Sequence, residues 1–140
     1  MKNRRNFIKK GALLASAAMV SATVFAKSES EKKKSINLPG LVFTEESQGK
    51  WEGKAGSHVP IVTVNGNKVK LLTKHGMSNS HYIVRHTLVD KAGTMIGAKT
   101  FSGDDAKAES TFELPAGYKG KLFATSFCNK HDFWVKEFDV

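Results

Sequence analysis

Short runs of β-branched and aromatic residues, separated by turn signals, follow one another from residue 61 to the end of the chain. Two of these runs flank Asn-Gly-Asn at residues 65–67, which is typical of a β-hairpin. No stretch after residue 26 has apolar residues at helical spacing. We therefore predict an all-β chain, with strands at residues 61–64, 68–72, 82–89, 94–101, 110–114, 121–127 and 133–140. About seven short strands with turns at this interval favour an immunoglobulin-like β-sandwich.

Residues 1–26 have the features of an export signal and are set apart from the fold. A basic segment containing Arg4 and Arg5 precedes an apolar run at residues 11–20 and a small-residue exit that ends at Ala26. The apolar run is short and rich in Ala and Ser, which argues against a membrane-spanning helix. The pattern resembles a twin-arginine signal peptide with cleavage after Ala26. It predicts a periplasmic protein exported through the twin-arginine route, which carries folded and often cofactor-loaded proteins.

The rest of the chain divides into a charged leader at residues 27–36, predicted to be disordered, and one small domain at residues 37–140. The whole chain has 22 Lys and Arg against 13 Asp and Glu, but five of the basic residues lie in the signal. The remainder has 17 basic and 13 acidic residues, a balance of +4. No basic stripe interleaved with aromatic residues is left, so we predict no nucleic-acid binding.

Cys128, the only cysteine, lies three residues before His131. A single cysteine cannot form an internal disulfide, and a free thiol in the periplasm is open to oxidation unless something binds it. With His58, His75 and His81, this pair makes a set of one thiolate and four imidazoles. Five donors exceed a tetrahedral zinc site, and mixed sulfur and nitrogen donors suit iron or copper. The set predicts a five-coordinate redox metal with one open position, at one end or edge of the sandwich.

Three other residues near these positions are predicted to have no chemical role. His86, the fifth histidine, lies five residues after His81, and strand alternation places it on the opposite sheet face. Met77 is predicted to fill a gap in the core. Trp134 is predicted to be a core residue or the wall that shields the loop after Cys128.

Three segments together resemble one protein family. They are His-Val-Pro at residues 58–60, His-Gly-Met-Ser-Asn-Ser-His-Tyr-Ile at residues 75–83, and Cys-Asn-Lys-His-Asp-Phe-Trp at residues 128–134. They resemble, in order and in spacing, the catalytic domain of superoxide reductases, which neelaredoxins and desulfoferrodoxins share. The resemblance covers nearly all of residues 41–140. The cysteine pair of an additional rubredoxin-like iron centre is missing, so the chain resembles the one-iron form.

The resemblance implies the metal, the reaction and the partners. One iron per chain, cycling between Fe2+ and Fe3+, would be held by equatorial imidazoles and one axial thiolate. The imidazoles would be those of His58, His75, His81 and His131, and the thiolate would be Cys128. The face opposite the thiolate would be open. The activity implied is the one-electron reduction of superoxide to hydrogen peroxide. A rubredoxin-like protein or a cytochrome would supply electrons, and the chain would form a homodimer or homotetramer. An axial thiolate pushes electron density through the metal, and we expect the amides of Lys130 and His131 to point at its sulfur.

The chain departs from the family directly before His58. Many members have Glu-Lys there, and in them the glutamate can bind ferric iron while the lysine attracts superoxide and helps protonate the product. Here the pair reads Gly-Ser at residues 56–57. Lys54 is therefore the first candidate for a replacement cation, ahead of Lys74 and Lys130. Gly76 also stands where proline is common.

Other functions stay open at this point. A member of the same fold could bind iron or transfer electrons without reducing superoxide, and only kinetics with superoxide would separate the two. A cupredoxin-like copper carrier also uses a Cys-x-x-His loop, but it normally has a methionine shortly afterwards. No methionine follows His131. Structural zinc is less favoured again, because five donors overfill a tetrahedron.

Overall fold

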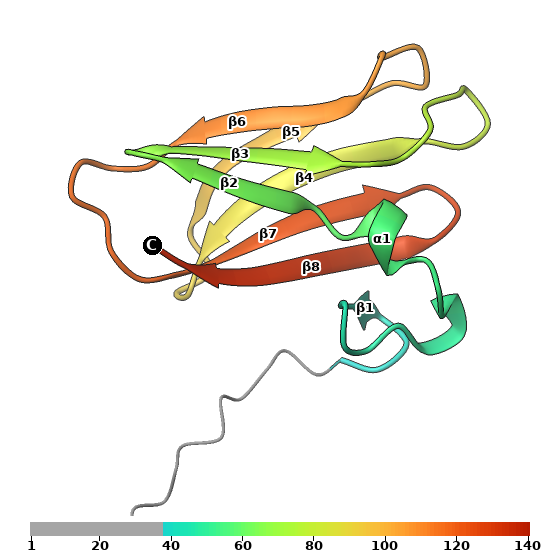
Figure 1. The fold of residues 1–140 in the computed structure, drawn as a ribbon, viewed down its shortest axis with the longest axis horizontal. Helices are drawn as coiled ribbons and strands as arrows, with labels where there is room; N and C mark the ends of the chain where they lie inside the picture. The colour runs from blue at the N-terminus through green and yellow to red at the C-terminus, as the bar shows by residue number, and fades with distance from the viewer. Residues whose placement is uncertain (1–37) are drawn as a thin grey trace, which may run out of the picture. The chain divides into compact units, whose positions relative to one another are not determined.

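The computed structural model describes residues 38–140, so the predicted signal at residues 1–26 and leader at residues 27–36 lie outside the described residues. Residues 38–140 form two β-sheets that face each other (Figure 1). This confirms the predicted all-β sandwich. No helix within this range is long and apolar enough to cross a membrane.

The two sheets differ in size. The five-stranded sheet has the order β1 (Val42–Phe43), β8 (Asp132–Asp139), β7 (Lys121–Cys128), β4 (Ile83–Asp90) and β5 (Met95–Thr100). The three-stranded sheet has the order β2 (Ile61–Asn65), β3 (Lys68–Thr73) and β6 (Ala108–Glu113). All neighbouring strands are antiparallel except β1, which runs parallel to β8.

The predicted strands are all present, with ends that move by at most two residues. The sequence interpretation missed β1, the single 3-10 turn η1 (Gly49–Trp51) and the one-turn helix α1 (Ala55–His58). Two residues are too few to show strand alternation. A single turn containing Gly56 and Ser57, both poor helix formers, has no helical period to detect.

Alternation along the strands buries one face of each sheet in the space between them. Along β3, for example, Val69, Leu71 and Thr73 are buried while Lys68 and Lys70 are exposed. The largest core cluster joins both sheets and contains Val69, Leu71, Leu88, Leu114, Leu122 and Ala124. This cluster contains none of the five residues predicted to bind a metal.

Two further clusters support the end of the sandwich where the histidines lie. One packs α1 against β1 and β8 through Phe43, Ala55, Val59 and Trp134. The other contains Ile83, Phe101, Ala108 and Cys128, with Met77 packed against it. Trp134 is therefore a core residue, and the partly buried Met77 packs against the core, in agreement with the predictions. Because α1, the β3–β4 loop and the β7–β8 turn all lie at this end (Figure 1), their side chains can converge.

Candidate metal centre

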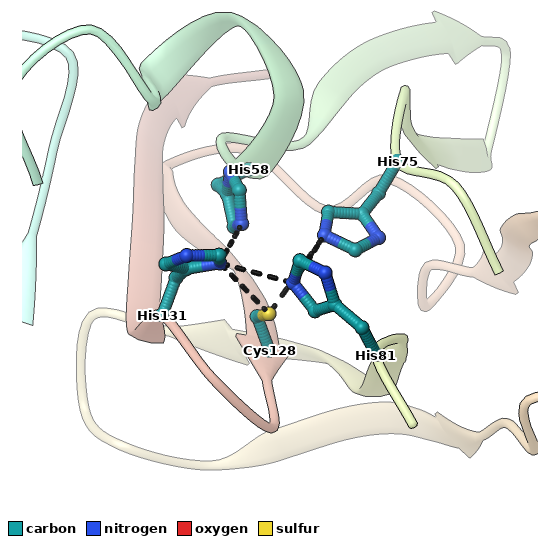
Figure 2. A group of neighbouring side chains, drawn as sticks. All are labelled: His58, His75, His81, Cys128 and His131. Carbon is teal, nitrogen blue, oxygen red and sulfur yellow. Dashed lines mark hydrogen bonds between the residues drawn. The ribbon is translucent and has the colours of Figure 1, made fainter. Parts of the chain in front are cut away.

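One cluster brings together all five residues predicted to bind a metal (Figure 2). Each offers one ligand atom, and these atoms all lie within 4.8 Å of one another: they belong to His58, His75, His81, Cys128 and His131. The residues come from four places in the chain: the end of α1, the β3–β4 loop, the last residue of β7 and the β7–β8 turn. His86 lies outside the cluster, in agreement with its predicted exclusion.

The imidazole nitrogens face one another at close range. His58 Nε2 lies 3.0 Å from His131 Nδ1, and His81 Nε2 lies 3.0 Å from the same atom. His75 Nε2 lies 3.1 Å from His81 Nε2. Four nitrogens converging from separate segments form a small, nitrogen-lined centre.

Two of the four histidines have their tautomer fixed by a backbone carbonyl. His58 Nδ1 lies 3.0 Å from the carbonyl oxygen of Lys54, and His75 Nδ1 contacts the carbonyl oxygen of Gly76. A carbonyl can only accept, so in each neutral ring Nδ1 carries the hydrogen and Nε2 presents a lone pair to the centre. A hydrogen bond from the second ring nitrogen to a backbone carbonyl is usual for a metal-binding imidazole.

The environment keeps these rings neutral at pH 7. Burial lowers the pKa of His58 to about 4, against an upward effect of the Lys54 carbonyl. Burial also lowers the pKa of His75 and of His81. For His131, burial followed by the positive charge of Lys54 lowers the pKa. Neutral rings whose lone pairs point at one centre cannot all receive a hydrogen bond from one another, because each ring has only one N–H. A metal cation can accept all of these lone pairs.

The sulfur lies on the inner side of the cluster. Cys128 is only 1% exposed, and its Sγ is 3.6 Å from His131 Nδ1 and 3.8 Å from His75 Nε2. The backbone N–H of Lys130 donates to Sγ at 3.5 Å, which confirms half of the predicted pair of amide contacts. Between residues 38 and 140 no matching contact is formed by the His131 amide. The thiol is thus shielded by the core and held by one backbone donor.

The open side of the cluster is the imidazole side. A hollow of about 350 Å³ is lined by all four histidines together with Lys54, Ser57 and Met77, but not by Cys128. Lys54 is exposed, and its charge acts on both His81 and His131. Lys74 instead lines a separate hollow between β2 and β8. The charge of Lys130 also acts on His81 and His131, but of the three candidate cations only Lys54 lines this hollow.

Three supporting residues escaped the sequence interpretation. Trp51 packs edge-on against the His131 ring, with 4.7 Å between ring centroids, and its Nε1–H donates to Asp132 Oδ2 at 3.0 Å. Lys50 also pairs with Asp132 at 2.9 Å, and its hydrogen bond lowers the pKa of that carboxyl. Asp132 follows His131 directly and could have been suspected, whereas Trp51 lies 81 residues from Asp132 and gives no sequence signal.

The turn that carries His131 is held from both sides. Asp132 adopts a left-handed backbone conformation with φ of 64°, which Asp tolerates better than most residues. Trp134 Nε1–H donates to the carbonyl oxygen of His131 at 2.8 Å.

The imidazole of His58 has a neighbouring side chain as a partner: Ser57 Oγ lies 2.8 Å from His58 Nδ1. Ser57, which directly precedes His58, therefore contacts an imidazole of the centre.

Solved superoxide reductases share the fold of this chain. The superoxide reductase (neelaredoxin) from Ignicoccus hospitalis is 21% identical, with a TM-score of 0.60, and the match covers 75% of this chain and 98% of that one. The one-iron superoxide reductase from Giardia intestinalis is 24% identical, with a TM-score of 0.54 over 60% and 98%. The superoxide reductase from Treponema pallidum is 31% identical, with a TM-score of 0.50 over 60% and 67%.

No curated protein matches the chain significantly by sequence. The sequence profile of the family described as desulfoferrodoxin, however, matches residues 48–137, which is well over half of the chain. The matched range contains every residue of the candidate metal centre. The chain belongs to the desulfoferrodoxin family.

Proposed function

We propose that this protein is a periplasmic non-haem iron superoxide reductase. The observation that carries the proposal is the convergence of four neutral imidazoles and one buried thiol on a centre with an open hollow on the imidazole side. In the reaction, superoxide takes up one electron and two protons and leaves as hydrogen peroxide. Bound iron would supply the electron by passing from Fe2+ to Fe3+.

The chain's own groups favour iron at this centre. His58 and His75 present Nε2 lone pairs because backbone carbonyls hold their Nδ1 hydrogens. Cys128 adds a soft donor from the core side, where it is protected from oxidants in solution. Five donors of this mixture exceed what structural zinc takes, and no methionine follows His131 at the place where copper carriers normally have one.

Lys54 supplies the positive charge beside the open side. Lys54 belongs to the lining of the hollow, and its charge acts on two of the facing imidazoles. A cation at the entrance raises the local concentration of a small anion and speeds its encounter with the site. In this proposal Lys54 replaces the cation that the family usually places directly before His58.

The location and the electron donor are further parts of the proposal. The basic segment with Arg4 and Arg5, followed by an apolar run, supports export through the twin-arginine route. Changing both residues to lysine keeps the charge but removes the motif, so the precursor should accumulate in the cytoplasm. Normal processing and location of this double variant would point to the general secretion route instead. In the periplasm, a rubredoxin-like protein or a cytochrome would restore Fe2+ after each turnover.

The test of the activity is a product count on full-length protein reconstituted with iron. We expect about one iron per chain and a visible thiolate-to-iron band in the oxidised protein. A pulse of superoxide given to the reduced protein should produce one hydrogen peroxide per superoxide and no dioxygen. Dismutation would instead give one peroxide for two superoxides, together with dioxygen. Cys128→Ser should lose the thiolate band and the reaction but remain folded, and full activity in this variant would refute the thiolate role.

A matched pair of lysine variants tests the entrance charge. Lys54→Ala should slow superoxide capture and reduce its dependence on salt. Lys91→Ala removes the same charge from the β4–β5 turn at the other end of the strand and should leave both unchanged. Equal rates for the two variants would remove Lys54 from the proposal. Iron binding with slow superoxide reaction in the unchanged protein would favour a non-catalytic iron-binding or electron-transfer role.

A further inference from the structure

A buried polar network crosses the sandwich directly beneath the candidate metal centre. His86, on β4, is completely buried, and its Nε2 lies 2.9 Å from Thr73 Oγ1 while its Nδ1 lies 2.8 Å from Ser110 Oγ. Thr73 Oγ1 in turn donates to Ser126 Oγ at 3.0 Å. The four residues stand on β3, β4, β6 and β7, so the network joins the two sheets.

Every member of this network depends on the orientation of the next. Since Thr73 gives its only hydrogen to Ser126, it accepts from His86 Nε2–H, and Nδ1 of the neutral ring then accepts from the Ser110 hydroxyl. Burial lowers the pKa of His86 to about 4, so the ring is neutral at pH 7. A fully paired buried network of this kind fixes the relative positions of the elements that carry it.

The network is close in sequence and in space to two ligand residues. Thr73 is the last residue of β3 and stands two residues before His75. Ser126 stands two residues before Cys128 on the same inward face of β7. The His86 ring also meets the Phe101 ring edge-on, with 4.9 Å between centroids, and Phe101 belongs to the core cluster that contains Cys128. Two direct contacts of His86, with Thr73 and with Phe101, and one indirect link to Ser126 through Thr73 therefore connect it to the residues beside the sulfur and the His75 imidazole.

Apolar side chains in place of His86 and its hydroxyl partners would fill the same space. Replacing both partners of a buried hydrogen bond by apolar groups of similar shape is often neutral for stability. Stability alone therefore gives little reason for a histidine in the middle of this core. Its distinguishing property is directional: it donates to the hydroxyl of Thr73 at the end of β3, and that hydroxyl in turn donates to Ser126 near the end of β7.

We propose that His86 is a positioning residue that sets the placement of Cys128 and His75 in the metal centre through Thr73, Ser126 and Phe101. The inference rests on the proposed metal centre but not on the reaction with superoxide. It predicts that loss of the network weakens metal binding and changes the sulfur–metal interaction, even though none of its members is a ligand. Groups that hydrogen-bond directly to a metal ligand typically contribute tenfold or more in metal affinity, and this network, which acts through the chain and through packing, should contribute up to about that much.

The experiment uses Co2+ as the probe, because its affinity and its thiolate charge-transfer band can be measured without superoxide. His86→Leu and Thr73→Val remove the network while keeping apolar bulk, and each should weaken Co2+ binding by up to about tenfold and shift the thiolate band. His86→Gln keeps a polar group near Nε2 and should recover part of both effects. Leu88→Ala is the matched control: Leu88 is fully buried two residues further along β4 but belongs to the central cluster, so it should destabilise the fold without moving the band.

Each outcome has a defined meaning. The inference would be overturned if Thr73→Val and His86→Leu had the Co2+ affinity and the thiolate band of the wild-type protein. It would also be overturned if these two properties changed no more in them than in Leu88→Ala. If His86→Leu fails to fold, the nearly isosteric Thr73→Val variant decides. Normal Co2+ results combined with no superoxide reduction by the iron-loaded protein would overturn the proposed reaction alone. Failure of the unchanged protein to bind Co2+ would overturn both.

Discussion

A single methyl group added at Gly103 should disturb the metal centre from outside it. Gly103 lies in the β5–β6 loop, and a Cβ at this position would stand 2.4 Å from the backbone nitrogen of Asn79 and 2.5 Å from its Cα. The carbonyl carbon of Ser78 would also be 2.5 Å away. These atoms belong to the loop that carries His75 and His81, and backbone atoms cannot rotate aside as a long side chain can.

The size of the disturbance follows from these distances. Ordinary contacts of a Cβ begin at 3.4 Å, so in Gly103→Ala the two loops must separate by about 1 Å. Overpacking of this kind costs about 2 kcal/mol, which lowers the Tm of a domain of this size by roughly 8–16 °C. Metal sites tolerate displacements of only about 0.2 Å from their preferred distances, so we also expect metal affinity to fall at least about tenfold.

Two measurements on full-length protein test this prediction. Chelator competition gives the metal affinity, and thermal unfolding gives the Tm. Gly76→Ala is the control, because a Cβ at Gly76 has nothing within 4 Å although the residue lies in the ligand loop itself. We expect Gly76→Ala to behave as the unchanged protein and Gly103→Ala to lose both affinity and Tm. If Gly103→Ala keeps both, the close approach of the two loops does not hold the ligand loop in place, and the reasoning is wrong.

Three further predictions concern protons and the His131 turn. Because the folded pKa of His86 lies near 4 and the unfolded value near 6.5, the metal-free protein should lose up to about 3 kcal/mol through this residue as pH falls from 6.5 to 4, and no more below. In urea unfolding, the free energy of unfolding of His86→Leu should fall by this much less than that of the wild-type protein over the same pH range. An equal fall in both proteins would contradict the low pKa of His86. For the same reason the low pKa of His58 should keep this ring unprotonated in the metal-free protein down to about pH 5, and an NMR titration showing its protonation centred at pH 6.5 would argue against it. Trp51→Phe keeps a ring beside His131 but removes the donor to Asp132, so the metal should dissociate faster into excess chelator, whereas an unchanged rate would make that hydrogen bond irrelevant.

Most of the fold could be predicted from local pattern, because each main strand is long enough to show alternation. The hairpin of β2 and β3 is an example: its Asn-Gly-Asn turn and flanking apolar residues are all within 13 residues. Strand β1 and helix α1 were missed because their order comes from packing. Phe43 and Ala55 are fixed by contact with Trp134 and its neighbours, far away in the chain.

In the candidate site, too, features carried by short sequence motifs could be predicted, and features that depend on contacts between distant residues could not. All five converging residues carry distinctive side chains in short motifs, so the sequence was sufficient to select them. The roles of Trp51 and the His86 network were beyond its reach. His86 was set aside as a residue without a role, and alternation did place it away from the ligands, but alternation says nothing about which hydroxyl groups meet it inside the core.

The wide spread of the converging residues along the chain has a consequence for folding. His58 and His131 are 73 residues apart, and a metal ion held by both closes that span as a covalent cross-link would. A chain with a single cysteine cannot make such a cross-link by itself. Metal at a thousand times its Kd would add about 4 kcal/mol to the free energy of unfolding. The stability of the folded chain would then depend on how much metal the surrounding compartment contains.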